Sequence, residues 1–222
     1  MKKSQQSGFT LVEIAIVLVI IGLLLGGILK GQELINSAKV KSLANDFRTI
    51  PTYIYAYQDK FKALPGDDTT AATHVTGATN ATTPAGKLGN GVLEGNWYSS
   101  TATDESYLFW QHVRLSNLAP GPTVVTDPDY WPKNAMGGFI GINSASAAAV
   151  QITGMTGTYQ ICSTGILGKF VKQLDIQMDD GNTATGSMRA TTNVTTTTLA
   201  QSAAIATASI DDATSYTVCQ TF

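Results

Sequence analysis

The chain has 222 residues and a formal net charge of −2, a length that fits one domain with a stalk or two small domains at most. Beyond Lys62 it has twelve Asp and Glu against six Lys and Arg, so this part carries a net charge of −6. An acidic, weakly charged segment of this kind lacks the basic surface that binds nucleic acid phosphates, and no direct nucleic acid binding is expected.

A short polar segment precedes a long apolar one at the N-terminus. Residues 1–7 include Lys2 and Lys3, and the following apolar segment, from Phe9 to Leu29, contains one charged residue, Glu13. As a helix, this segment spans about 30 Å, which is enough to cross a bilayer core. A charge inside such a segment is costly and usually marks a functional residue. The two lysines favour a cytoplasmic N-terminus.

The sequence from Gly8 to Glu13 reads Gly-Phe-Thr-Leu-Val-Glu and resembles the N-terminus of the type IV pilin and pseudopilin family. In that family a prepilin peptidase, which is also the methylase, cleaves after the glycine, here Gly8. The new N-terminal residue, here Phe9, is N-methylated. The resemblance implies that the Glu13 carboxylate meets the α-amine of a neighbouring subunit in a helical filament. The implied partners are the peptidase, copies of this chain, other pilins and the inner membrane.

The resemblance implies a structural subunit of a type IV pilus-like filament. Two alternatives stay open: a pseudopilin of a type II secretion system, and a membrane-anchored periplasmic binding protein that does not polymerise. Before assembly the chain is expected to cross the inner membrane once, with its N-terminus in the cytoplasm and its head in the periplasm. Afterwards it is expected in a periplasmic or cell-surface filament.

The segment after the apolar one is predicted to be an amphipathic stalk helix over residues 30–64. From Leu43 to Leu64 the apolar residues recur at alternating steps of four and three, which is the stripe a helix needs in order to dock. Pro51 interrupts the pattern and predicts a kink near residues 49–51. The Pro-Gly-Asp-Asp sequence at residues 65–68 predicts the end of the helix.

The next hundred residues give fewer signals. Asp67 and Asp68 are interpreted as turn and cap residues, with calcium ligation as the alternative. Residues 69–103 are rich in Thr, Ala, Gly and Asn and are predicted to form an extended surface loop. Residues 104–118 predict a short amphipathic helix that Asp104 caps. His112 is interpreted as a packed or surface residue, because no second His or Cys lies at metal spacing.

Short β-branched or alternating segments follow, separated by Gly, Asn and Asp. They complete a predicted α+β fold, in which the long N-terminal helix docks on a small antiparallel β-sheet head. Residues 180–182, Asp-Gly-Asn, predict a hairpin turn. The predicted strands are residues 138–143, 149–153, 158–162, 174–178, 187–190 and 214–219.

Cys162 and Cys219 are the two cysteines, and both lie in the predicted head. A disulfide is the default for such a pair outside the inner membrane. Many pilins close a C-terminal loop with such a bridge. In the chain-entropy model it would stabilise the fold by roughly 4 kcal/mol.

No cofactor is expected, and the alternative considered is Ca²⁺ at Asp179, Asp180 and Asn182, since some pseudopilins bind calcium in this part of the head. An EF-hand does not fit, because Ile176 and Met178 would occupy ligand positions.

The Thr-rich segment 191–209 has three interpretations: an exposed insertion between strands, a variable face, or a glycosylated surface.

No enzymatic activity is expected, and no residue is assigned a catalytic role. The sequence contains neither a Gly-x-Ser-x-Gly elbow nor a His-Glu-x-x-His helix, and two histidines leave few general bases near neutral pH.

The predicted domains are a leader (1–8), a transmembrane and filament-core helix (9–29), the stalk helix (30–64) and the globular head (65–222).

Overall fold

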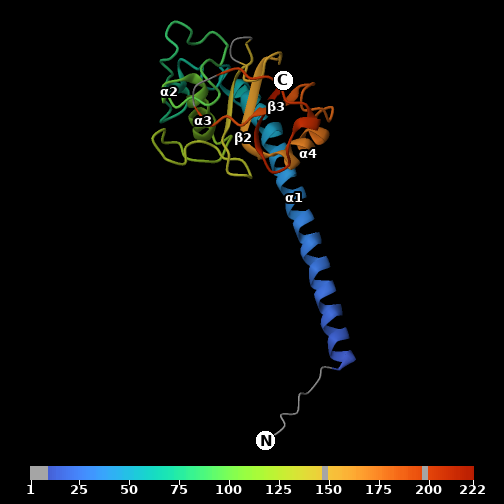
Figure 1. Ribbon diagram of the computed structural model, residues 1–222. Coiled ribbons are helices and arrows are strands. Elements are labelled where there is room, and N and C mark those ends of the chain that lie inside the picture. Colours follow the sequence, from blue (N-terminus) through green and yellow to red (C-terminus); the bar gives the residue numbers. More distant parts are fainter. Residues whose placement is uncertain (1–9, 147–149, 197–199) are drawn as a thin grey trace, which may run out of the picture. The chain divides into compact units, whose positions relative to one another are not determined.

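The computed structural model describes residues 10–146, 150–196 and 200–222 (Figure 1). The chain divides into two compact units, Met1–Ala38 and Lys39–Phe222. The predicted leader, with Gly8, and Phe9 lie outside the described residues. The predicted domain boundaries at residues 8, 29 and 64 stay predictions.

The longest element is helix α1, Leu11–Phe61, which contributes to both units. Its apolar N-terminal part is long and apolar enough to cross a membrane. Within the first unit, every large apolar side chain from Leu11 to Ile35 is exposed. The helix continues through Pro51 without a break, and the predicted kink there stays a prediction.

The second unit contains a four-stranded antiparallel sheet with the strand order β1-β2-β4-β3. The two central strands pair with Cys162 opposite Cys219, and a bulge between Ser163 and Ile166 places Gly165 at a positive φ of 70°. The α+β class with a long N-terminal helix and a small antiparallel sheet is confirmed. The strands are β1 (Ile140–Ser144), β2 (Tyr159–Leu167), β3 (Met188–Thr192) and β4 (Ser215–Thr221).

Within the second unit, the C-terminal part of α1 forms one side of the core and lies alongside the sheet (Figure 1). Leu43 and Ile54 are fully buried, as the stripe of alternating steps predicts. They belong to the same cluster as Ile142 and Ile161 of the sheet. Helix α3, Glu105–Leu115, packs against this cluster through Phe109 and others. The head is therefore built around a part of α1, not beside it.

The predicted strand at residues 174–178 is wrong, because this segment is the end of helix α4, Gly168–Met178. Phe170, Val171 and Leu174 are its buried residues, at the three- and four-residue spacing of a helix face. Ile176, which the strand interpretation would bury, is 70% exposed. Three alternating apolar residues within a five-residue segment are too few to distinguish the two-residue period of a strand from the period of a helix. Residues 180–182 consequently follow a helix and do not form a hairpin turn between strands.

Two other expectations need correction. Residues 150–153 of the predicted strand 149–153 form a turn with one isolated bridge, from Ile152 to Ser202, and Ala149 lies outside the described residues. The segment 69–103 contains a short helix, α2 (Ala71–His74), and is not only a surface loop. Its side chains Leu93 and Trp97 are buried, so the segment contributes to the core.

Both edges of the sheet are covered by other parts of the head. At the β3 edge, the Ile205 amide donates to the Ala190 carbonyl, and the Ala190 amide donates to the Thr183 carbonyl. At the β1 edge, the Ser144 amide donates to Leu93, and the Ile140 amide donates to Pro132. In the Thr-rich segment 191–209, residues 191 and 192 belong to β3, residues 203–205 lie beside that strand, and the segment ends in a 3₁₀ turn, η1 (Thr207–Ser209). Covered edges resist pairing with other chains.

The disulfide between Cys162 and Cys219 joins the central strands across a separation of 57 residues. Replacing both cysteines by alanine is expected to lower the free energy of unfolding by about 4 kcal/mol, because the unfolded chain regains the entropy of that loop. Urea unfolding of the two proteins measures the difference, and reduction of the wild type serves as the matched control. A loss below about 1 kcal/mol would contradict the entropic account.

Asp175 gives the head a pH-dependent stability. Both oxygens of its carboxylate are buried, and no described group makes a hydrogen bond of good geometry to either of them. Burial, together with the charges of Asp180 and Asp179, raises its pKa to about 6, and the amides of Gly181 and Asn182 offset this only in part. The pKa of Asp175 is higher in the folded state than in the unfolded state. The stability that its protonated form contributes is therefore complete below about pH 4 and is lost as the pH rises through about 6.

Asp175→Asn is therefore expected to flatten the decline of stability between about pH 4 and pH 6.5 and to stabilise the head at neutral pH, by an amount on the order of 2 kcal/mol. Thermal unfolding across this pH range measures it. The decline is reduced but not abolished, because burial also raises the pKa of Asp46 to about 6 and that of Glu105 to about 8. Asp59→Asn, at an exposed site of α1, is the control. Equal pH profiles for Asp175→Asn and the wild type would refute the assignment.

Candidate functional site

The N-terminal end of helix α1 is closed by a reciprocal pair of side chains. The Thr10 amide and hydroxyl donate to Oε2 of Glu13 at 2.7 and 2.8 Å. In return, the Glu13 amide donates to the Thr10 hydroxyl at 3.3 Å. This arrangement is a capping box, in which two otherwise free helix amides are satisfied by side chains. The carboxylate also lies at the positive end of the helix dipole.

The cap leaves part of the Glu13 carboxylate available. Both bonds from Thr10 end on Oε2, and Oε1 accepts no hydrogen bond from any residue that the structure describes. The side chain is exposed within its unit. A charge that would be costly in an apolar environment is therefore partly balanced by its own helix, with one oxygen free for a further donor.

Sequence reasoning singled out Glu13 but missed Thr10. The signal was present, because Thr-x-x-Glu before an apolar segment is the signature of a capping box. Gly8 and Phe9, the predicted cleavage and methylation residues, lie outside the described residues, and their roles stay predictions.

The three residues considered for calcium are each used by the local backbone between α4 and β3. Asp179 accepts from the Met188 amide at 2.8 Å, and Asp180 accepts from the Asn182 amide and the Thr185 hydroxyl. Asn182 accepts from the Ala184 amide. These bonds are turn chemistry. Calcium binding by Asp179, Asp180 and Asn182 stays an untested prediction.

His112 of α3 is fully buried and holds two other segments together. Its Nδ1 accepts from the Gly66 amide at 2.9 Å, and its Nε2–H donates to the Thr79 carbonyl at 2.8 Å. Burial lowers the pKa of His112 below its usual value, and these bonds fix the neutral tautomer. The residue is thus a packed structural histidine.

Asp104, at the N-cap of α3, makes no side-chain cap bond and accepts instead from the hydroxyls of Thr83 and Ser99.

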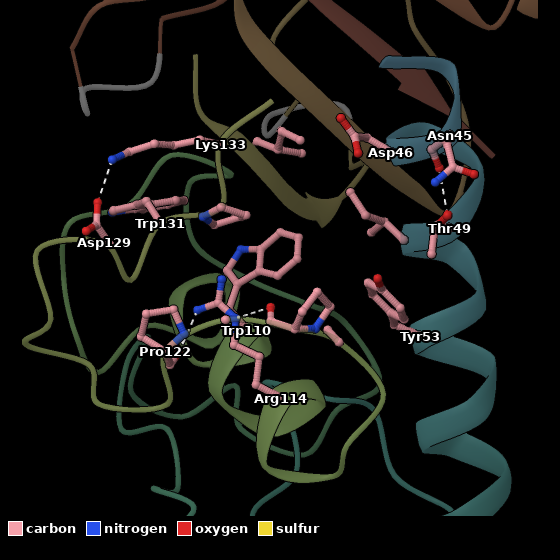
Figure 2. A pocket seen from close by; sticks show the side chains of 16 residues that line it. Asn45, Asp46, Thr49, Tyr53, Trp110, Arg114, Pro122, Asp129, Trp131 and Lys133 are labelled. Atoms are coloured by element: carbon pink, nitrogen blue, oxygen red, sulfur yellow. Dashed lines mark hydrogen bonds and ion pairs between the residues drawn. The ribbon is translucent and has the colours of Figure 1, made fainter. Parts of the chain in front are cut away.

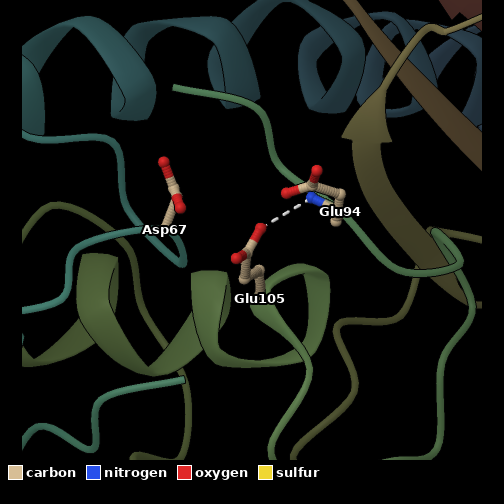
Figure 3. Close-up of side chains that lie close together, drawn as sticks. All are labelled: Asp67, Glu94 and Glu105. Carbon is tan, nitrogen blue, oxygen red and sulfur yellow. Dashed lines mark hydrogen bonds between the residues drawn. The ribbon is translucent and has the colours of Figure 1, made fainter. Parts of the chain in front are cut away.

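Three carboxylates meet beside the start of α3 (Figure 3). They belong to Asp67, Glu94 and Glu105, and their nearest oxygens lie within 4.8 Å of one another. Burial, with contributions from the charges of Asp67 and Glu94, raises the pKa of Glu105 to about 8. Sequence reasoning did not group these residues, because they come from three segments that are brought together only by folding.

The head also has a pocket of about 480 Å³ between α1, α3 and the loop after α3 (Figure 2). Trp110, Trp131 and the half-buried Asp46 line it. Arg114 also lines the pocket, and its guanidinium donates hydrogen bonds to the carbonyls of Pro120, Pro122 and Tyr130. None of the described lining residues is a histidine or cysteine.

Comparison with known families gives one match. Residues 3–29 match the prokaryotic N-terminal methylation motif. The chain therefore carries a prepilin-type N-terminus of the type IV pilin and pseudopilin kind. No curated protein and no solved structure matches the chain. The motif points to a structural protein and implies processing by a prepilin peptidase and assembly with other pilins. With the apolar helix, it fits anchoring in a membrane before assembly.

The capping box makes a testable prediction about the start of the helix. Thr10→Val removes the hydroxyl and should destabilise the first turn by about 1 kcal/mol, which corresponds to roughly fivefold faster exchange of the Glu13 and Ile14 amides. Amide hydrogen exchange of the protein in detergent micelles measures this. Thr10→Ser keeps the hydroxyl and should retain the protection. Equal exchange in the valine and serine variants would show that the cap does not form.

Proposed function

We propose that the chain is a structural subunit of a type IV pilus-like filament, processed after Gly8 and polymerised through its N-terminal helix. The observation that carries the proposal is a helix with an exposed apolar surface from Leu11 to Ile35, headed by a capped carboxylate. Lipid can cover such a surface during storage, and neighbouring helices of the same kind can cover it in a filament.

The proposed orientation follows from the charges at the N-terminus. Lys2 and Lys3 precede the apolar segment, which favours a cytoplasmic N-terminus and a periplasmic head. The oxidised pair Cys162 and Cys219 agrees with a head outside the reducing cytoplasm. A prepilin peptidase in the inner membrane would then meet the Gly8–Phe9 bond on the cytoplasmic side.

Glu13 would set the axial position of each subunit. Cleavage after Gly8 creates an α-amine at Phe9, and in a filament that amine from one subunit would donate to the free Oε1 of Glu13 in its neighbour. Inside an apolar core, an unpaired carboxylate or amine is strongly destabilising, so the subunits would pack only where the two charges meet. The bonds from Thr10 to Oε2 would hold the carboxylate ready for that contact.

Glu13→Val is expected to leave cleavage and methylation intact and to abolish filament formation, since the pairing charge is lost. The measurement is the yield of sheared or membrane-associated filaments beside the mass of the processed subunit. Glu33→Ala is the matched control: this acid lies on the same helix, exposed and paired with Lys30 at 2.7 Å. It should assemble normally. Wild-type filament yield from Glu13→Val would refute the role of Glu13.

Intact mass in two fractions separates the proposal from its alternatives. A processed chain that begins at methylated Phe9 in material sheared from the cell surface supports a pilus subunit. The same mass confined to washed membranes supports a pseudopilin of a type II secretion system. An uncleaved chain that retains residues 1–8 would indicate a membrane-anchored binding protein that does not polymerise, and would overturn the proposal.

A further inference from the structure

The geometry of the head points to a second site: we propose that Asp67, Glu94 and Glu105 bind a divalent cation, with Ca²⁺ as the preferred ion. The three carboxylates turn toward one another (Figure 3). The site lies in the head and involves neither Glu13 nor the apolar helix surface. It can therefore be tested on unassembled protein, whatever becomes of the filament proposal.

Two of the carboxylate oxygens are buried and unpaired. Glu105 is 0% exposed, and its Oε1 has no hydrogen-bond partner, although its Oε2 accepts from the Glu94 amide at 2.7 Å. Oε2 of Glu94 is likewise buried and without a partner. Buried polar atoms are nearly always satisfied in folded proteins, so a pair of unpaired oxygens facing a third carboxylate indicates a missing positive partner.

The described surroundings do not supply that charge. The carboxylate of Asp67 accepts only the amides of Gly89 and Gly91, which orient it without neutralising it. Lys87 reaches the other oxygen of Glu94 at 3.7 Å, but its side chain is 62% exposed, so solvent screens its charge. Three carboxylates at this separation repel one another strongly unless a cation or a proton lies between them.

The donor set selects the class of ion. All three side chains offer hard carboxylate oxygens, the ligands that Ca²⁺ and Mg²⁺ prefer over thiolate and imidazole donors. His112, the histidine that also contacts this part of the head, uses both ring nitrogens for Gly66 and Thr79. Ca²⁺ accepts six to eight oxygens in flexible geometry, so three carboxylates with water can hold it without an octahedral cage.

The location gives the cation a structural task. Asp67 follows the end of α1, Glu94 lies in the long segment before α3, and Glu105 is in the first turn of α3. The backbones approach closely, because a Cβ atom added at Gly66 would collide with the Glu105 carbonyl oxygen. An ion here would bind all three segments together, and would fix the irregular segment 69–103 to the helices on either side of it in the chain.

The test uses the full-length protein in detergent micelles after treatment with EDTA and dialysis. Titration calorimetry with CaCl₂ near neutral pH should show one site per chain, and Ca²⁺ should raise the thermal midpoint of the head. Glu105→Gln and Asp67→Asn should each weaken binding by at least about tenfold, because affinity depends on the number of charged ligands. Glu94→Gln, at a residue whose side chain is 14% exposed, is a third variant if either of these fails to fold.

Asp179→Asn is the matched control, since Asp179 belongs to the other group considered for calcium. It should bind Ca²⁺ as the wild type does. Loss of binding in Asp179→Asn, with normal binding in the Glu105 and Asp67 variants, would place the ion elsewhere and overturn the proposal. It would also be overturned if neither Ca²⁺ nor Mg²⁺ changes the midpoint while Glu105→Gln raises it, because the carboxylates would then be held by a shared proton.

Discussion

The constraint on which the rest of the structure depends is the apolar surface of helix α1. From Leu11 to Ile35 its side chains are exposed, and water cannot be their stable surroundings. Every plausible environment, lipid or other helices, excludes water, so any charge in this segment must bring its own compensation. The capping box of Thr10 and Glu13 provides part of it from within the same helix turn.

The same helix changes its role within the second unit. From Val40 onward its residues follow a stripe that is buried among the strands and α3, and Leu43, Phe47 and Ile54 are part of the main core. Helix and head are thus one cooperative structure from Lys39 on. A soluble version of the head that lacked this part of α1 would lose one wall of its core and expose the apolar faces of β1 and β2.

The sequence was sufficient where one local pattern decides the outcome. The Gly-Phe-Thr-Leu-Val-Glu motif, the stripe from Leu43 and the helix of α3 depend on neighbours in the chain. It failed at α4, where Leu174, Ile176 and Met178 alternate by chance, and helical burial of Phe170 and Val171 prevailed. It could not bring Glu94 and Glu105 to Asp67, since such proximity exists only after three separate segments have packed.

The covered edges of the sheet have a consequence for how surface change can accumulate. Because the backbone groups of β1 and β3 are engaged by Leu93, Pro132, Thr183 and Ile205, the head has little capacity to exchange strands with a neighbour. Those bonds involve main-chain groups only, so side chains at the surface of the head can be substituted without opening either edge of the sheet.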